Sequence, residues 1–194
     1  MRKILIRATL ILLLVGTCIA GWVYRARIVA LVETTIVSST TSGPAPDPET
    51  YSVLSESLEE HRRRLSADYR RTTSNTERTK ILAQARTLLE MSLPRLMRCW
   101  LGTPWDFNGI AHEPGDGKVA CGYFVSSVLQ DAGFRVEWAP LAQQASQNIL
   151  GTFLPPDDMK IRGGVDYERF LSEVLSCGNG IYIVGLDSHV AFLV

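Results

Sequence analysis

VACGYFVSSVL, residues 119–129, is the stretch that decides the fold of this chain. The apolar residues that follow its cysteine recur at the spacing of one buried helical face, and the next glycine, Gly133, predicts the end of the helix. The residues of this face are Phe124, Val125, Val128, Leu129 and Ala132. Cys121 lies three and four residues before Phe124 and Val125, so we expect it on the same inward face, in the first turn.

A cysteine in this position has two interpretations. Free cysteine is among the most buried residue types, which favours simple packing. A helix N-terminus and a nearby imidazolium, however, both lower the pKa of a thiol and favour the thiolate, which is the form that attacks a substrate. The chain has three histidines, His61, His112 and His189. His189 begins an apolar strand just after a turn, so we predict a Cys121–His189 dyad and keep a purely structural role open for both residues.

The end of the chain predicts β-structure. Residues 180–184 and 189–194 are apolar stretches separated by a turn at 185–188, whereas residues 51–91, 141–150 and 166–176 have helical patterns. Helices come first and strands follow, which is typical of the α+β class with an antiparallel sheet. We expect the helix of Cys121 to pack on this sheet.

Upstream, residues 51–91 predict a helical hairpin. One helix runs to about Arg71, the segment 72–75 breaks it, and a second helix covers residues 76–91. Ser92 is expected to cap a further short helix with Pro94 in its first turn. We interpret the hairpin as a packing arm, with a spacer or a partner surface as alternatives.

The N-terminus predicts a targeting segment. Basic residues precede an apolar run from Ala8 to Tyr24, which fits either a signal peptide or a retained transmembrane anchor within residues 1–32. We favour the anchor, and Cys18 leaves lipidation as a third option. Residues 33–50 are small, polar and Pro-rich and predict a linker. In each case the rest of the chain is expected to be exported, on the periplasmic or extracellular side of a bacterial membrane.

Net charge and cysteine spacing argue against several kinds of ligand and partner. Lys+Arg and Asp+Glu both number 20, so the net charge is zero and a nucleic-acid partner is not expected. No CxxC pair is present, so we predict no metal site, and nothing predicts a cofactor. Whether Cys99 and Cys177 form a disulfide or stay free is left open by the sequence.

The ordered set of short motifs resembles the NlpC-like cell-wall cysteine peptidases. These motifs are Gly102-Thr103-Pro104-Trp105, Asn108-Gly109, Cys121-Gly122-Tyr123-Phe124-Val125 and Ser188-His189-Val190-Ala191-Phe192, with the polar segment 142–147 after the cysteine helix. The resemblance covers residues 92–194. It implies a papain-like domain there, with Cys121 as the nucleophile and His189 as the base.

The same resemblance implies hydrolysis of amide bonds in peptidoglycan stem peptides. Trp105 stands where the family has a tyrosine that binds the oxyanion, and Gly122 replaces a serine and leaves room for a wide substrate. Ala120 replaces the usual aspartate, and only five residues follow His189, among which the polar residue that orients the family's histidine has no counterpart. Two explanations are left open: a chain truncated at its C-terminus, or a divergent domain closed by other elements. One alternative is a non-catalytic, membrane-tethered scaffold or partner-binding module. Another keeps the Cys121–His189 dyad but has a different amide or a thioester as substrate.

Overall fold

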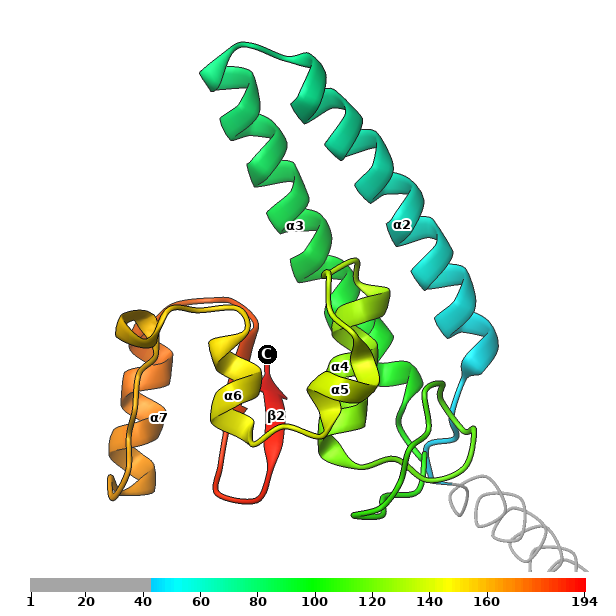
Figure 1. Ribbon diagram of the computed structural model, residues 1–194, viewed down its shortest axis with the longest axis vertical. Helices are drawn as coiled ribbons and strands as arrows, with labels where there is room; N and C mark the ends of the chain where they lie inside the picture. Colours follow the sequence, from blue (N-terminus) through cyan, green and yellow to red (C-terminus); the bar gives the residue numbers. More distant parts are fainter. Residues whose placement is uncertain (1–42) are drawn as a thin grey trace, which may run out of the picture. The chain divides into compact units, whose positions relative to one another are not determined.

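The computed structural model describes residues 43–194, which form a mixed α+β unit (Figure 1). The predicted signal peptide or anchor lies outside the described residues. In chain order the elements are α2 (Pro48–Arg71), α3 (Asn75–Cys99), α4 (Cys121–Asp131), α5 (Trp138–Ala142), α6 (Ser146–Gly151), a 3-10 turn (Pro156–Asp158), α7 (Tyr167–Ser176), β1 (Tyr182–Gly185) and β2 (Val190–Leu193). The predicted α+β class is confirmed.

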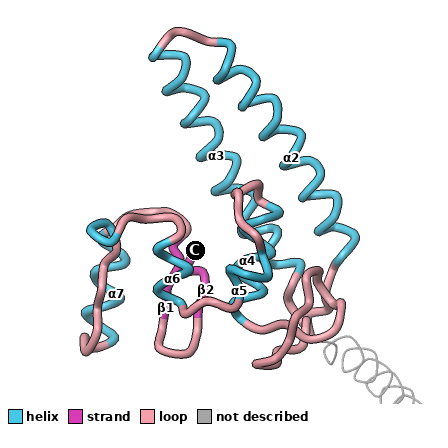
Figure 2. The backbone as a smooth tube through the Cα atoms, in the orientation of Figure 1, coloured by secondary structure: helices cyan, strands magenta, loops and turns pink. Residues whose placement is uncertain are grey.

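Helices α2 and α3 form the predicted hairpin, with a short turn at residues 72–74 (Figure 2). Asp47 caps α2, because its Oδ1 accepts a hydrogen bond of 2.9 Å from the Thr50 N–H. Ser74 caps α3 in the same way through the Glu77 N–H, at 3.4 Å. The Asp47 N–H also donates to the Cys99 carbonyl at 2.9 Å, so the end of the predicted linker is fixed against the far end of α3.

The separate helix expected from Ser92 is wrong, because α3 continues without a break to Cys99 and contains Pro94. A proline inside a helix removes one backbone hydrogen bond. Here the apolar face continues on both sides of the proline, with Leu93 and Leu96 buried at 5% and 0% exposure. Burial of this face offsets the lost bond, so α3 carries the hairpin directly into the core.

The base of the hairpin belongs to the same core as the later residues. Tyr51 packs edge-on against Trp100 at 5.8 Å between ring centroids, and Trp100 packs edge-on against Phe124 of α4 at 5.6 Å. Val128 of α4 is fully buried in this cluster. Residues on either side of the expected boundary at 91–92 therefore share one packed interior.

Helix α4 has the predicted bounds. It begins at Cys121 and ends at Asp131, and Gly133 follows with a φ of 92°, a conformation that favours glycine. The helix expected over 141–150 is instead two short helices, α5 and α6, separated by residues 143–145. This break lets Ala142 lie against α4 and Ser146 reach the turn between β1 and β2.

The two strands form an antiparallel hairpin in which Gly185 pairs with Val190 and Ile183 pairs with Phe192. Alternate residues share a face, and Ile183, Val190 and Phe192 all pack on the cluster of α4. Helix α7 begins after Asp166, whose Oδ1 accepts from the Arg169 N–H at 2.9 Å, which confirms the helix predicted there. Helix α7 contributes no buried residue to either core cluster.

Candidate active site

The Gly102–Trp105 loop is joined by its backbone to the residues just before Cys121. The Val119 N–H donates to the Pro104 carbonyl at 2.9 Å, and Trp105 and Val119 form an isolated bridge. The Ala120 N–H donates to the Gly109 carbonyl at 3.0 Å. Trp105 therefore lies beside the start of α4, and its side chain is 61% exposed.

Cys121 is the first residue of α4 and is half-buried. Ala120 caps the helix in an extended conformation and supplies no side-chain acceptor, and no acidic residue occupies the first turn. The Phe124 N–H makes the first helical hydrogen bond, to the Ala120 carbonyl at 2.9 Å. The earlier N–H groups have no partner within the helix, and such an end attracts negative charge. This position suits either a thiolate or an oxyanion.

Gly122 is buried where α4 meets α5. A Cβ atom at this position would lie 2.2 Å from the Ala142 carbonyl oxygen, far closer than two such atoms approach. The Ser126 hydroxyl also donates to the Gly122 carbonyl. Close contact between two helices thus explains this glycine, whereas the sequence analysis assigned it to substrate access.

His189 ends the turn between the strands and is exposed. The Leu186 N–H donates to the His189 carbonyl at 2.7 Å, which closes the turn. The Ser146 hydroxyl at the start of α6 donates to the Leu186 carbonyl, also at 2.7 Å. Ser146 therefore anchors the turn that carries His189. The sequence analysis noted the polar segment 142–147 but did not single out this serine.

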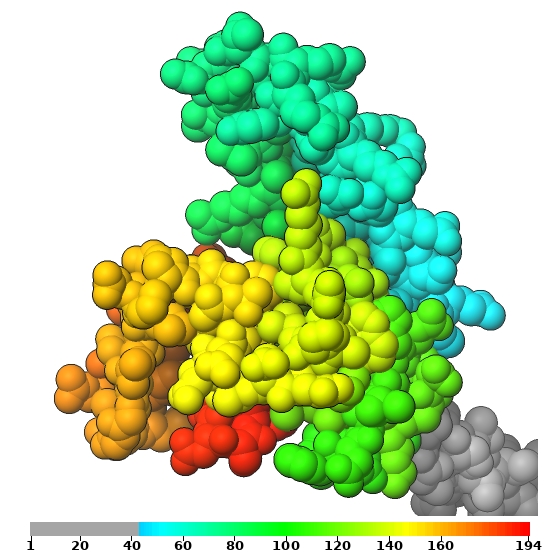
Figure 3. Space-filling model, viewed as in Figure 1, coloured from blue at the N-terminus to red at the C-terminus, as the bar shows by residue number. Residues whose placement is uncertain are grey.

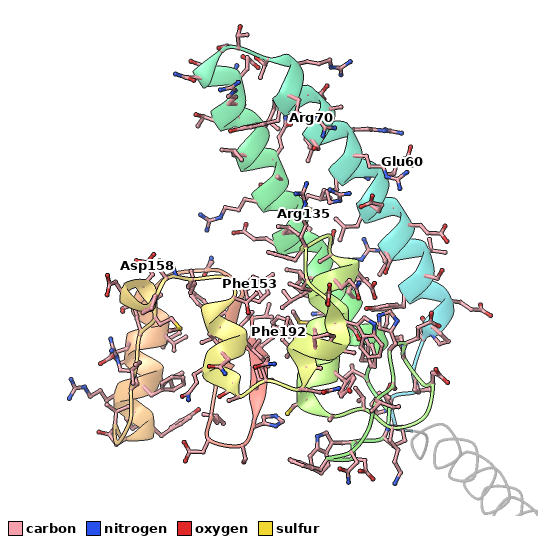
Figure 4. All side chains as sticks on the ribbon, viewed as in Figure 1. Glu60, Arg70, Arg135, Phe153, Asp158 and Phe192 are labelled. Atoms are coloured by element: carbon pink, nitrogen blue, oxygen red, sulfur yellow. The ribbon has the colours of Figure 1, made fainter. Side chains whose placement is uncertain are left out.

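Cys121 and His189 lie at the same end of the α4–β2 interface. Cys121 packs on the cluster that contains Val190, and Phe124, three residues later, packs edge-on against Phe192 at 5.9 Å (Figure 4). Helix α4 and strand β2 therefore run in the same direction, with the thiol near the start of one and the imidazole just before the start of the other.

The two side chains are not joined by a hydrogen bond. Among residues 43–194, no hydrogen bond joins the Cys121 Sγ to His189, and neither ring nitrogen of His189 makes a hydrogen bond. No polar residue in this part of the chain therefore orients the His189 ring through a hydrogen bond. The backbone thus brings Cys121 and His189 to one end of the α4–β2 interface, but no hydrogen bond forms between their side chains.

Cys99 and Cys177, whose pairing the sequence left open, are both free. Cys99 is buried in the core of the hairpin base, and this burial raises the pKa of its thiol. Cys177 is exposed at the end of α7, where its Sγ lies 3.3 Å from the Lys160 Nζ. Neither of these two cysteines lies at the start of a helix.

A second polar cluster lies at the opposite end of α4 and was missed by the sequence analysis. The Tyr51 hydroxyl donates to the Asp131 Oδ2 at 2.7 Å, and burial raises the pKa of Asp131 above its usual range. His112 packs on Trp138 at 4.5 Å between ring centroids. Its Nε2 is buried without a hydrogen-bond partner among the described residues. No sequence spacing connects these residues, so only the fold reveals them.

Comparisons with protein families, curated proteins and solved structures found no match to this chain. The resemblance to the NlpC-like peptidases therefore remains a prediction from short motifs. Within residues 43–194, no group of three or more histidine, cysteine, aspartate or glutamate residues is arranged to hold a metal ion. No helix in that range has the length and apolar character needed to cross a membrane.

Proposed function

We propose that this chain is a cysteine-nucleophile amide hydrolase with a divergent papain-like arrangement in residues 92–194. The observation that carries this proposal is the position of Cys121 at the uncapped start of α4, at the same end of the α4–β2 interface as His189. A helix start without an acidic residue favours a thiolate, and the adjacent turn supplies an imidazole from a different element.

The proposed reaction passes through an acyl-enzyme. His189 accepts the proton of Cys121, the thiolate attacks the amide carbonyl carbon, and a C–S bond forms as the carbonyl becomes an oxyanion. The C–N bond then breaks, and the His189 imidazolium gives its proton to the leaving amine. Water, deprotonated by His189, hydrolyses the thioester and releases the carboxylic acid and the free thiol.

Backbone donors at the start of α4 are the proposed oxyanion hole. The N–H of Cys121 precedes the first helical hydrogen bond and has no partner within the helix. The indole N–H of Trp105 is a second candidate donor, because its loop pairs with Val119 beside the nucleophile. One such donor contributes about 3 kcal/mol to the stability of a transition state.

The proposed substrate is the stem peptide of peptidoglycan, and the proposed location is the outer side of a bacterial membrane, with the N-terminal segment as anchor or signal. Both proposals rest on the sequence motifs and on the basic and apolar pattern of residues 1–32. Neither a nucleic acid nor a cofactor is part of the proposed reaction.

A second candidate is a non-catalytic, membrane-tethered scaffold in which Cys121 is a packing residue. One observation favours it: Cys121 packs on the buried cluster of Val125 and Val190, whereas its Sγ makes no hydrogen bond to His189 among the described residues. In this case the hairpin and the anchor would present a surface to a partner.

Thiol labelling separates the two candidates. The full chain, held in mild detergent, would be treated with iodoacetamide at mildly acidic pH, and the labelled peptides identified by mass spectrometry. The hydrolase proposal predicts rapid labelling of Cys121 that His189→Ala slows, with Cys177 as the exposed internal reference. Labelling of Cys121 only at alkaline pH would support the scaffold.

Muropeptide digestion tests the substrate. The full chain would be incubated with purified muropeptides and the products separated by mass, with Cys121→Ala as the inactive variant and Cys177→Ala as the matched control. Cleavage that disappears only in Cys121→Ala is expected. Normal labelling without cleavage would retain the nucleophile and reject the stem peptide as substrate.

A further inference from the structure

The loop between α3 and α4 carries a group of large apolar side chains that face water. Four of them lie between residues 101 and 110: Leu101, Trp105, Phe107 and Ile110, with exposed fractions of 52%, 61%, 71% and 66%. Single exposed apolar residues are common on protein surfaces, whereas a group of them marks an interaction site. Figure 3 shows this loop, in green, at the end of the unit away from the turn between α2 and α3.

The backbone of this loop is fixed by hydrogen bonds. The Asp106 N–H donates to the Val119 carbonyl at 3.2 Å, and the Ala111 N–H donates to the Lys118 carbonyl at 3.0 Å. Asp106 also holds the tip of the loop, because its Oδ1 accepts from the Asn108 N–H and its Oδ2 pairs with Lys118, both at 2.9 Å. Exposure of the apolar side chains is therefore a property of the folded loop, and the charges at its tip are matched.

The described chain enters the unit beside this loop. The Pro44 carbonyl oxygen lies so close to Gly102 that a Cβ atom there would overlap it, and Gly102 has a φ of 86°. Pro46 packs on Gly115, where its Cβ would lie 3.0 Å from an added Cβ atom. Residues 44–46 are therefore fixed against both ends of the loop.

This entry point limits the distance between the loop and the N-terminal segment. Residues 25–43 join Tyr24, the last residue of the apolar run, to Pro44. A chain of this length spans at most about 70 Å, whatever its conformation. With the apolar run in a bilayer, as proposed above, the loop is held at high effective concentration beside that bilayer, so that a weak contact is sufficient.

The side chains of the loop fit the boundary between water and lipid. Tryptophan is enriched at this boundary, and phenylalanine and isoleucine bury their side chains among the acyl chains. Two further acidic residues, Glu113 and Asp116, lie in the second turn of the loop, where the Asp116 N–H donates to the Glu113 carbonyl at 3.2 Å. Anionic lipid would repel these carboxylates, so a zwitterionic surface fits the loop better.

We propose that this loop inserts Phe107 and Ile110 into the surface of the bilayer that holds the N-terminal segment. Trp105, which pairs with Val119 two residues before Cys121, then lies between the lipid and the candidate active site. The contact sets the distance of Cys121 from the bilayer. This inference rests on the proposed anchor but not on the proposed hydrolysis, because a non-catalytic scaffold would bind lipid in the same way.

The test uses a tryptophan placed in the loop. The full chain with Phe107→Trp would be reconstituted in phosphatidylcholine vesicles, with and without bromine atoms on the acyl chains, and the wild-type emission subtracted. Brominated lipid is expected to quench the emission of the added tryptophan. Leu82→Trp in α3 and Leu175→Trp in α7 replace apolar side chains that are 57% and 70% exposed, and their added emission should not be quenched.

A pair of variants tests the contact at Ile110. In the chain that carries Phe107→Trp, Ile110→Asp should remove most of the quenching, because a carboxylate is costly to bury in lipid. Ile161→Asp makes the same change at another isoleucine, which is 82% exposed, and should leave the quenching unchanged. Flotation with the vesicles reports on the anchor separately, and thermal unfolding establishes that each variant folds.

Several results would overturn the proposal. A chain that floats with the vesicles while its residue 107 reporter stays unquenched would retain the anchor and reject the loop contact. A chain that does not float would reject both, whereas thiol labelling of Cys121 still tests the hydrolase. Quenching of the Leu175→Trp reporter instead would assign the lipid contact to α7, and equal quenching of all three reporters would remove any preference for the loop. A shift of the residue 107 emission that follows protein concentration but not bromine would assign the loop to a second copy of the chain.

Discussion

The base and the arm of the α2–α3 hairpin belong to the same two helices but are stabilised differently. Every buried residue of the pair lies at the base: Tyr51 and Leu58 on α2, and Leu93, Leu96 and Cys99 on α3. The arm, residues 59–92, contains no buried residue, and its ion pairs are exposed and lie within each helix, such as Glu59 with Arg62 and Lys80 with Glu77.

This difference has an energetic consequence. Burial of apolar side chains contributes a few kcal/mol per residue, whereas an exposed ion pair contributes about 0 to 1 kcal/mol. We therefore expect the base to unfold only with the whole unit and the arm to open locally at lower free energy.

The largest effect is expected from Leu96→Ala at the base. Leu96 is fully buried, so truncation should lower the free energy of unfolding by about 2 to 5 kcal/mol through lost burial and a residual cavity. Leu82→Ala in the arm is the matched variant, because Leu82 is 57% exposed, and its effect should stay within about 0.5 kcal/mol. Urea unfolding measures both, and equal effects would remove the contrast between base and arm.

The next effect concerns Gly122, where α4 meets α5. Gly122→Ala should lower the free energy of unfolding by about 1 to 3 kcal/mol, since its Cβ would lie 2.2 Å from the Ala142 carbonyl oxygen. Gly151→Ala is the control: no atom lies within 4 Å of its added Cβ, and it should be neutral or stabilise α6 by up to about 1 kcal/mol. A tolerated alanine at 122 would show that the two helices can separate.

Tyr51→Phe removes the hydrogen bond that joins the hairpin base to the end of α4. We expect a loss of about 1 to 3 kcal/mol at neutral pH, because the Asp131 carboxylate stays half-buried without its donor. Asp131→Asn is the companion variant, since an amide oxygen still accepts from the Tyr51 hydroxyl and carries no charge. It should leave stability unchanged or higher.

The pH dependence of stability distinguishes these two variants. Burial raises the pKa of Asp131 above 3.8 in the folded state, so the folded chain binds this proton more tightly than the unfolded chain. The free energy of unfolding therefore increases as pH falls from the raised pKa toward 3.8, and it decreases again as pH rises through the same range. The hydrogen bond from Tyr51 lowers the pKa of Asp131 and so opposes the shift. Tyr51→Phe should therefore make stability depend more steeply on pH, and Asp131→Asn should remove the contribution of this carboxyl to the pH dependence. Unfolding curves between pH 3 and neutrality that are parallel for all three proteins would contradict this assignment.

Local patterns predicted elements better than they predicted contacts. The spacing of Phe124, Val125 and Val128 was sufficient for α4, and Gly133 for its end, because both depend on nearby residues only. The α+β class and both strands followed from the order of patterns. The continuation of α3 through Pro94 could not be predicted, since the compensating burial of Leu96 comes from residues elsewhere in the chain.

The candidate site shows the same limit. Motif order placed Trp105, Cys121 and His189 near one end of α4, and the backbone contacts of Pro104 with Val119 agree with it. The anchoring of the His189 turn by Ser146 depends on where α6 begins, and the Tyr51–Asp131 bond joins residues 80 positions apart. Neither leaves a periodic signal in the sequence.

The smallest effect is expected from Glu59→Gln in the arm. Glu59 accepts hydrogen bonds from Arg62 and Arg63, which lower the pKa of its carboxyl from 4.5 to about 2. A lowered pKa contributes stability above pH 4.5 that is lost as pH falls toward 2. The side chain is 34% exposed and its partners more so, so solvent screening limits the loss in Glu59→Gln to about 0.5 kcal/mol at neutral pH.

Hydrogen exchange is the measurement that fits so small a change. Glu59→Gln should speed exchange of amides in the arm while amides near Leu96 keep their wild-type rates, because the arm opens without the base. High salt should reduce the difference between variant and wild type, as screening weakens exposed pairs. A change that reaches Leu96 would mean that ion pairs in the arm and burial at the base form a single cooperative unit.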